Sequence, residues 1–200
     1  MIRKSLLLLS AASALALAAC GSLGRSSGGV AIYDLGPPAM VLGGAATASA
    51  GVALEVRLPA WFDAADMAYR LNYQDPQRLY AYTQARWAGQ PATLLQQRLR
   101  QKLAIVPGGA TCTLRLELDE FSQVFQTSSQ SRALLQGEAL LLGKARNVLA
   151  RQSIRIEAAA GGDAASGAVA LAGATDTLAT QLLPLLEKNS TGCRPQPVAN

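Results

Sequence analysis

A chain of 200 residues, half of them apolar, is long enough for one domain with a buried core. The formal charge is +5, and subtracting Arg3 and Lys4 of the leader leaves +3. The remaining basic residues are scattered, which is not typical of nucleic-acid binding. The sequence has no histidine, which excludes His-based triads, histidine general bases and His-ligated metals. Its three cysteines cannot form a four-thiolate zinc site.

Residues 1–19 have the three parts of a secretory signal. Arg3 and Lys4 form the positive region, the run from Leu6 opens the apolar region, and Leu17-Ala18-Ala19-Cys20 matches a lipobox. We therefore expect a diacylglycerol on the Cys20 sulfur and cleavage just before this residue. The alternative is an ordinary cleavable signal with an incidental cysteine. A transmembrane helix is disfavoured because the apolar run is too short.

Acylation at Cys20 would anchor the mature protein to a membrane without spanning it, since several acyl chains exceed what stable anchoring needs. Lipoboxes of this type are bacterial. Gly21 follows the cysteine, in place of the aspartate that resembles an inner-membrane retention signal. This favours the periplasmic face of the outer membrane. Residues 21–29 are rich in Gly and Ser, and such a linker has an r.m.s. reach of roughly 16 Å.

The first half of the domain is predicted to hold several strands and a helix. Residues 30–35 form a strand that Gly36-Pro37-Pro38 ends, and residues 39–51 form a Gly/Ala-rich loop. Residues 52–58 alternate between apolar and other side chains, as a strand with one buried face does. Residues 66–73 and 78–86 form a hairpin across the turn signal Asp75-Pro76. Pro91 starts an amphipathic helix that continues to Leu103.

The second half is predicted to hold three strands and a second helix. Residues 111–119 alternate most clearly, and residues 133–142 and 148–158 form a hairpin. Asp163 is the expected N-cap of a long helix that Pro184 should kink or end. This order predicts an α+β two-layer sandwich, in which two helices cover one face of an antiparallel or mixed sheet. The domain would span residues 30–188, followed by a tail at 189–200.

Cys112 and Cys193 remain after Cys20 is acylated. Two cysteines in an oxidising periplasm predict a disulfide, which would tie the tail to the central strand. The alternative is two unpaired thiols, with Cys112 acting as a small buried residue.

The segment from Pro59 to Leu103 concentrates the large rigid side chains of the chain. It holds both tryptophans and every tyrosine except Tyr33, in a sequence otherwise built of Ala, Leu and Gly. Aromatic side chains bury much apolar area and keep a polar handle. The segment is therefore either the best-packed part of the core or a surface for a partner.

The order of this segment resembles the ABC-type transport auxiliary lipoprotein component family. The residues that carry the resemblance are Pro59 and Trp61, the Met67-Ala68-Tyr69-Arg70 strand, Arg86-Trp87, and Pro91 before Leu94-Leu95. Tyr33-Asp34-Leu35 matches the opening Tyr-x-Leu motif, and the resemblance extends to about Leu186. The relatives share the broad α+β arrangement.

The resemblance implies partners in the bacterial envelope. They are an ABC permease and ATPase in the inner membrane and a substrate-binding protein of the mammalian-cell-entry (MCE) type that carries lipid. Relatives can form homo-oligomeric rings that dock the end of an MCE tunnel. Tyr, Trp and Arg usually carry interface energy. The candidate contacts are therefore Trp61, Phe62, Tyr69, Arg70, Tyr73, Arg86 and Trp87.

No catalytic constellation stands out in the sequence, so an enzyme is not expected and no cofactor is predicted. Asp63, Asp66 and Asp75 lie at turn positions, where aspartate satisfies local backbone donors. Two other functions stay open. A lipid carrier would need a dry cavity between sheet and helices, and an outer-membrane assembly or plug lipoprotein would have a β-barrel partner.

Overall fold

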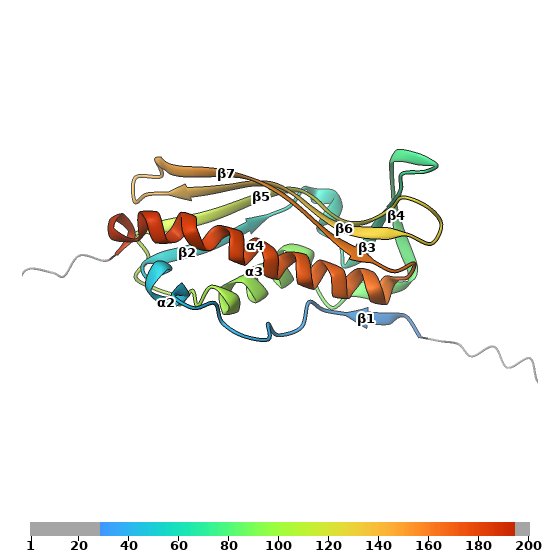
Figure 1. Cartoon of the computed structure of the whole chain (residues 1–200), viewed down its shortest axis with the longest axis horizontal. Coiled ribbons are helices and arrows are strands. Elements are labelled where there is room, and N and C mark those ends of the chain that lie inside the picture. Colours follow the sequence, from blue (N-terminus) through green and yellow to red (C-terminus); the bar gives the residue numbers. More distant parts are fainter. Residues whose placement is uncertain (1–28, 195–200) are drawn as a thin grey trace, which may run out of the picture.

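The computed structural model describes residues 29–194, and the predicted signal, Cys20 and most of the linker lie outside this range. The described chain forms one seven-stranded mixed sheet whose one face is covered by α3 and α4 (Figure 1). This confirms the predicted α+β sandwich. The elements are β1 (Ala31–Tyr33), α2 (Ala45–Ala48), β2 (Val52–Arg57), the 3-10 helix η1 (Ala60–Phe62), β3 (Asp66–Leu71), β4 (Asp75–Trp87), α3 (Pro91–Lys102), β5 (Cys112–Phe125), β6 (Ser131–Leu142), β7 (Val148–Ala160) and α4 (Ala164–Cys193).

The long strand β5 organises the sheet, whose order is β1-β4-β3-β5-β6-β7. Along one side β5 pairs antiparallel with β6. Along the other side it pairs in parallel with two strands in turn, since β2 lies beside its first half and β3 beside its last residues. The alternation predicted for β5 is present, because Leu114, Leu116 and Leu118 are all buried.

The two faces of the sheet differ in polarity. The inner face packs on α3 and α4, where Leu95, Leu99 and Leu178 are fully buried. The outer face carries ion pairs between neighbouring strands, among them Arg115 with Glu55 at 2.8 Å. Pairs that stay partly open to solvent, as this one does, each stabilise the fold by only about 0–1 kcal/mol. The outer face is therefore a hydrated, charged surface with little net stabilising value.

Both predicted helix starts are confirmed. Pro91 stands at the first position of α3. Asp163 caps α4, because its carboxylate accepts a hydrogen bond from the backbone N–H of Ser166 at 2.7 Å, and that hydrogen bond lowers the pKa of Asp163. By length and composition α4 is apolar enough to cross a membrane, but here it packs against the sheet as the main core helix.

Three local predictions were wrong. The region 39–51 is not all loop, since it contains α2, whose start at Gly44 uses a left-handed backbone that glycine adopts easily. The hairpin turns at residues 72–74, and Asp75 and Pro76 already belong to β4. Helix α4 does not end at Pro184 but continues to Cys193, because Pro184 lies on the exposed side where water can reach the carbonyl group it leaves unpaired.

Gly137 is required where β5 and β6 lose their regular register. The pairing shifts between Leu118 and Glu120, and Gly137 has a φ of 153°. A Cβ at this position would lie 2.2 Å from the carbonyl oxygen of Glu117. We predict that Gly137→Ala lowers the free energy of unfolding by about 3 kcal/mol or more, as urea denaturation would measure. Gly173→Ala is the control, since open space surrounds that position. A neutral Gly137→Ala would contradict this bulge geometry.

Candidate partner-binding surface

The hairpin of β3 and β4 extends beyond the body of the sheet. Tyr69 pairs with Tyr80 across the two strands, while only the end of β3 pairs with β5. The turn of the hairpin, drawn in green, stands away from the layer of α3 and α4 (Figure 1). This arrangement presents the turn and its flanking side chains to solvent.

Arg70 fixes the direction of this hairpin. Its guanidinium lies 2.8 Å from the carboxylate of Glu120 on β5, and it also donates to the backbone carbonyl of Gln77 at 3.2 Å. Both charged side chains are mostly buried. Arg70 therefore joins the outgoing and returning strands to the central strand, and its charge is not free for a partner.

A cluster of aromatic rings stiffens the same hairpin. The ring of Tyr69 stacks on Tyr80 with centroids 5.2 Å apart and meets Tyr82 at 4.6 Å and Phe125 at 5.9 Å. The guanidinium of Arg78 lies 4.6 Å from the centre of the Tyr80 ring. Stacked rings and a cation over a ring face are both favourable arrangements. The cluster holds the two strands as a rigid unit.

Tyr82 connects the aromatic cluster to the start of α4. Its hydroxyl donates to the side-chain carbonyl of Gln123 at 2.9 Å, and the amide nitrogen of Gln123 donates to Ser131 and to the backbone of Gly161. Burial, together with nearby Tyr69 and Asp163, raises the pKa of Tyr82, so the phenol stays protonated. Gly167 on α4 leaves room for Gln123, because a Cβ there would overlap its amide.

We predict that Gln123→Ala destabilises the protein by about 3 kcal/mol, since it leaves buried hydrogen-bonding groups without a partner. The expected result is a lower midpoint of urea denaturation with an unchanged slope. Gln97→Ala, at an exposed position of α3, is the matched control. Equal midpoints for the two variants would mean that the Gln123 network contributes nothing.

The structure separates the predicted contact residues into three groups. Trp61, Tyr73 and Arg86 are exposed, and Trp61 is 67% accessible to solvent. Tyr69 and Arg70 are partly buried within the hairpin, where they set its shape. The three exposed residues remain candidates for direct contact with a partner.

Phe62 and Trp87 are buried, so the prediction that they contact a partner was wrong for this conformation. Phe62 is 3% exposed and Trp87 is 2% exposed. The Trp87 ring packs against Phe121 of β5 with centroids 5.6 Å apart. Trp87 follows Ala85 on the inner face of β4, whereas Arg86 points outward. These two aromatics therefore stabilise the fold beneath the exposed surface.

The sequence reasoning missed Arg78, Tyr80 and Tyr82 as members of the site. They occupy alternate positions of β4, so their side chains share one face of the strand. The signal was present as a period of two in the sequence. It was overlooked because the turn was placed at Asp75-Pro76, which left the returning strand without a clear register.

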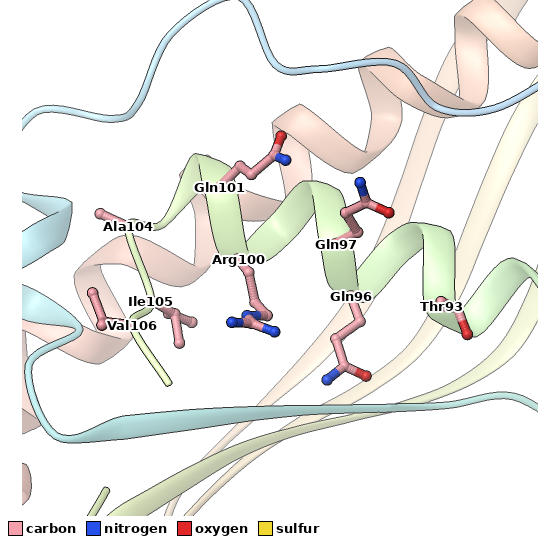
Figure 2. Close-up of a pocket in the computed structure, with 8 residues that line it drawn as sticks. All are labelled: Thr93, Gln96, Gln97, Arg100, Gln101, Ala104, Ile105 and Val106. Carbon is pink, nitrogen blue, oxygen red and sulfur yellow. The ribbon is translucent and has the colours of Figure 1, made fainter. Parts of the chain in front are cut away.

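A second concave surface lies along α3. It is a shallow groove of about 680 Å³ between α3 and the following loop. Figure 2 shows Gln96 and Arg100 directed toward β2 and Gln97 and Gln101 directed the other way. Gln96 donates to the backbone carbonyl of Leu54 at 3.1 Å. Across residues 29–194 no three His, Cys, Asp or Glu side chains gather as metal ligands would.

Cys112 and Cys193 are joined by a disulfide in the structure, with their Cα atoms 5.2 Å apart. The bond attaches the end of α4 to the start of β5. The Thr111 hydroxyl also donates to the Cys193 carbonyl there. Formation of this bond in the protein as it is made in the cell stays a prediction. Its expected effect on the free energy of unfolding is large, because the bond closes a long loop of the chain.

The comparisons with known proteins agree with this architecture. Residues 33–182 match the family described as the ABC-type transport auxiliary lipoprotein component. The chain belongs to this family. Association with an ABC transport system and attachment to the bacterial envelope as a lipoprotein follow from that membership.

Solved structures show the same fold. A Xanthomonas campestris protein of family DUF330 superposes with a TM-score of 0.69 at 17% identity, over 80% of this chain and 99% of that chain. A second structure, described as an uncharacterized protein, gives a TM-score of 0.63 at 14% identity, over 79% of this chain and 99% of that chain. No curated protein matches the sequence. At these identities the likeness concerns the fold alone.

Proposed function

We propose that this family member is a non-catalytic docking subunit of an MCE-associated lipid transport system. It is anchored through Cys20 at the periplasmic face of the outer membrane. It binds an MCE-type protein, which connects it to the ABC permease and ATPase of the inner membrane. Assembly into a homo-oligomeric ring is part of the same proposal, because the family resemblance implies it.

The exposed residues of the hairpin and of the η1 turn that precedes it are the observation that carries this proposal. Exposed Trp61, Tyr73 and Arg86 belong to the residue types that most often dominate binding energy. The ring cluster and the Arg70–Glu120 pair hold this region rigid before binding, which lowers the entropic cost of association. A rigid surface of this composition is suited to a protein partner.

The two alternative functions have less support. A lipid carrier needs an enclosed apolar cavity between sheet and helices, whereas the hollow along α3 and the hollow beside the start of α4 are open at the surface. The same space is filled by buried leucines and alanines. A β-barrel assembly lipoprotein would differ in its partner, which one experiment can identify.

That experiment is a crosslinked pull-down of the full-length lipoprotein from intact envelopes, read by mass spectrometry. We expect recovery of an MCE protein together with its ABC permease. Recovery of a β-barrel in their place would support the assembly role and contradict the transport role. Co-purified lipid in native mass spectrometry, without those partners, would support the carrier.

The exposed residues are tested in the same pull-down. We predict that Trp61→Ala combined with Tyr73→Ala lowers recovery of the partner by roughly tenfold or more, since interface hot spots cost about 2 kcal/mol or more when truncated. Leu149→Ala is the matched control, because Leu149 is an exposed apolar residue of β7, the strand at the other edge of the sheet. Equal recovery from both proteins would exclude Trp61 and Tyr73 as docking contacts.

A further inference from the structure

The outward side of α4 is almost free of charge. From Ala164 to Leu186 the only charged residue is Asp176, and its carboxylate accepts hydrogen bonds from Arg98 and Lys102 of α3. The exposed positions of α4 up to Pro184 carry no charge, with Gln181 as the one large polar side chain among them, and Val169 is 75% exposed. The exposed charges of α4, Glu187 and Lys188, lie near its C-terminal end. A helix of this length on the surface of a domain usually presents charged or polar side chains to water on its outward face.

An extended segment, residues 34–44, crosses the same side of the helix layer, and we call it the strap (Figures 1 and 2). Near its start, Arg98 donates to the backbone carbonyl of Gly36 at 2.7 Å. Farther along, the backbone N–H of Leu42 donates to the carbonyl of Lys102 at 3.0 Å. The strap therefore lies fixed along the helices.

The strap carries one exposed charge at its start, Asp34, and adds apolar side chains farther along. Met40 is 69% exposed and Val41 is also exposed. On α3 the side chains of Gln97 and Gln101 point the same way and carry no charge (Figure 2). The outer face of the sheet is different, since its arginines pair with glutamates, as in Arg151 with Glu138 and Arg132 with Glu157. The middle of the helix-and-strap side is therefore nearly free of charge, whereas the outer sheet face carries charged side chains along its strands.

The membrane tether joins the domain beside the apolar face. The chain enters the structure at Gly29 and β1 follows at once. Ala31 of β1 and Ala165 of α4 line one shallow hollow, so the tether ends near the first turn of α4. Nine residues separate Cys20 from Val30 and reach roughly 16 Å. The acyl anchor therefore holds this face at a high effective concentration near the bilayer.

We propose that the strap and the outward side of α4 rest on the bilayer that holds the Cys20 acyl chains. Met40, Val41 and Val169 enter the interface, where apolar faces sink roughly 5–10 Å into the boundary between headgroups and acyl chains. The charged sheet face then points into the periplasm. This inference rests on the lipid anchor and not on the transport partner. The membrane orientation and the proposed docking role can therefore fail independently of each other.

Site-specific fluorescence on the mature lipoprotein tests this orientation. Because Cys20 is acylated and Cys112 is bonded to Cys193, one introduced cysteine gives one free thiol for an environment-sensitive dye. The labelled positions are Val41→Cys and Val169→Cys on the proposed face and Ser153→Cys on the outer sheet face. The protein is placed in vesicles of phosphatidylethanolamine and phosphatidylglycerol that contain lipids with a quenching spin label.

We expect the dyes at positions 41 and 169 to lose fluorescence to the quenching lipids and the dye at position 153 to keep it. Equal quenching at all three positions would overturn the proposal. A dye at position 169 that is shielded from water without lipid quenching would also overturn it, because a second copy or another protein would then cover the face. A dye at Thr177→Cys should lose its quenching when Val41→Asp and Val169→Asp are added, and unchanged quenching would again contradict the inference.

Discussion

Trp87→Ala is expected to destabilise the protein by about 3–5 kcal/mol, the usual cost of removing a buried tryptophan. Trp87 is almost completely buried and its ring packs against Phe121 of the central strand. The substitution leaves a cavity beside the Phe121 ring in the core under the sheet. Urea denaturation followed by circular dichroism would show a lower midpoint with little change in slope.

Trp61→Ala is the matched comparison, because it removes the same side chain from an exposed position of the same segment. Surface substitutions of this kind usually change stability by no more than about 0.5 kcal/mol. We expect near wild-type unfolding for this variant and impaired capture of the partner. A large loss of stability in Trp61→Ala, or none in Trp87→Ala, would contradict the assignment of one ring to the surface and the other to the core.

Loss of the disulfide is the second large effect. Cys112 and Cys193 are 81 residues apart in sequence, and closing such a loop stabilises the protein by up to about 4–5 kcal/mol in the chain-entropy model. We predict that Cys112→Ala combined with Cys193→Ala lowers the free energy of unfolding by several kcal/mol. Both residues are buried, so part of the loss reflects packing.

Reduction separates the bond from the packing. The wild-type protein in dithiothreitol should approach the stability of the double variant, while the double variant itself should not respond to the reductant. Intact-mass analysis after alkylation under native redox conditions adds a direct reading. A secreted protein that alkylates at both Cys112 and Cys193 without reduction would show that the bond does not form.

Alternation in the sequence predicted the core of the sheet well. The buried row of β5 from Cys112 to Leu118 and the hairpin of β6 and β7 follow from a period of two, because each strand has one face on the helices. The end of β5 was harder to predict. The register shift after Leu118 changes which residues face inward, so Phe121 and Phe125 do not continue the earlier pattern.

The surface of the site was only partly predictable. Trp61 and Phe62 are neighbours in one 3-10 turn, yet one is exposed and the other is buried. Residue type alone cannot separate them, since both are large aromatics. Trp87 could have been placed inward from its spacing to Ala85, with charged Arg86 between them. The Arg70–Glu120 pair joins residues 50 positions apart, and only the fold brings them together.

Photo-crosslinking from the hairpin in living cells is the most direct test of the proposed docking role. A photoreactive amino acid would replace Tyr73 at the hairpin turn and, as the matched control, Ser153 on the outer sheet face, both of which are exposed. The proposed role predicts a covalent adduct with an MCE-type protein from position 73 and none from position 153. An adduct with that protein from position 153 alone, or only adducts with other envelope proteins from position 73, would contradict docking through the hairpin.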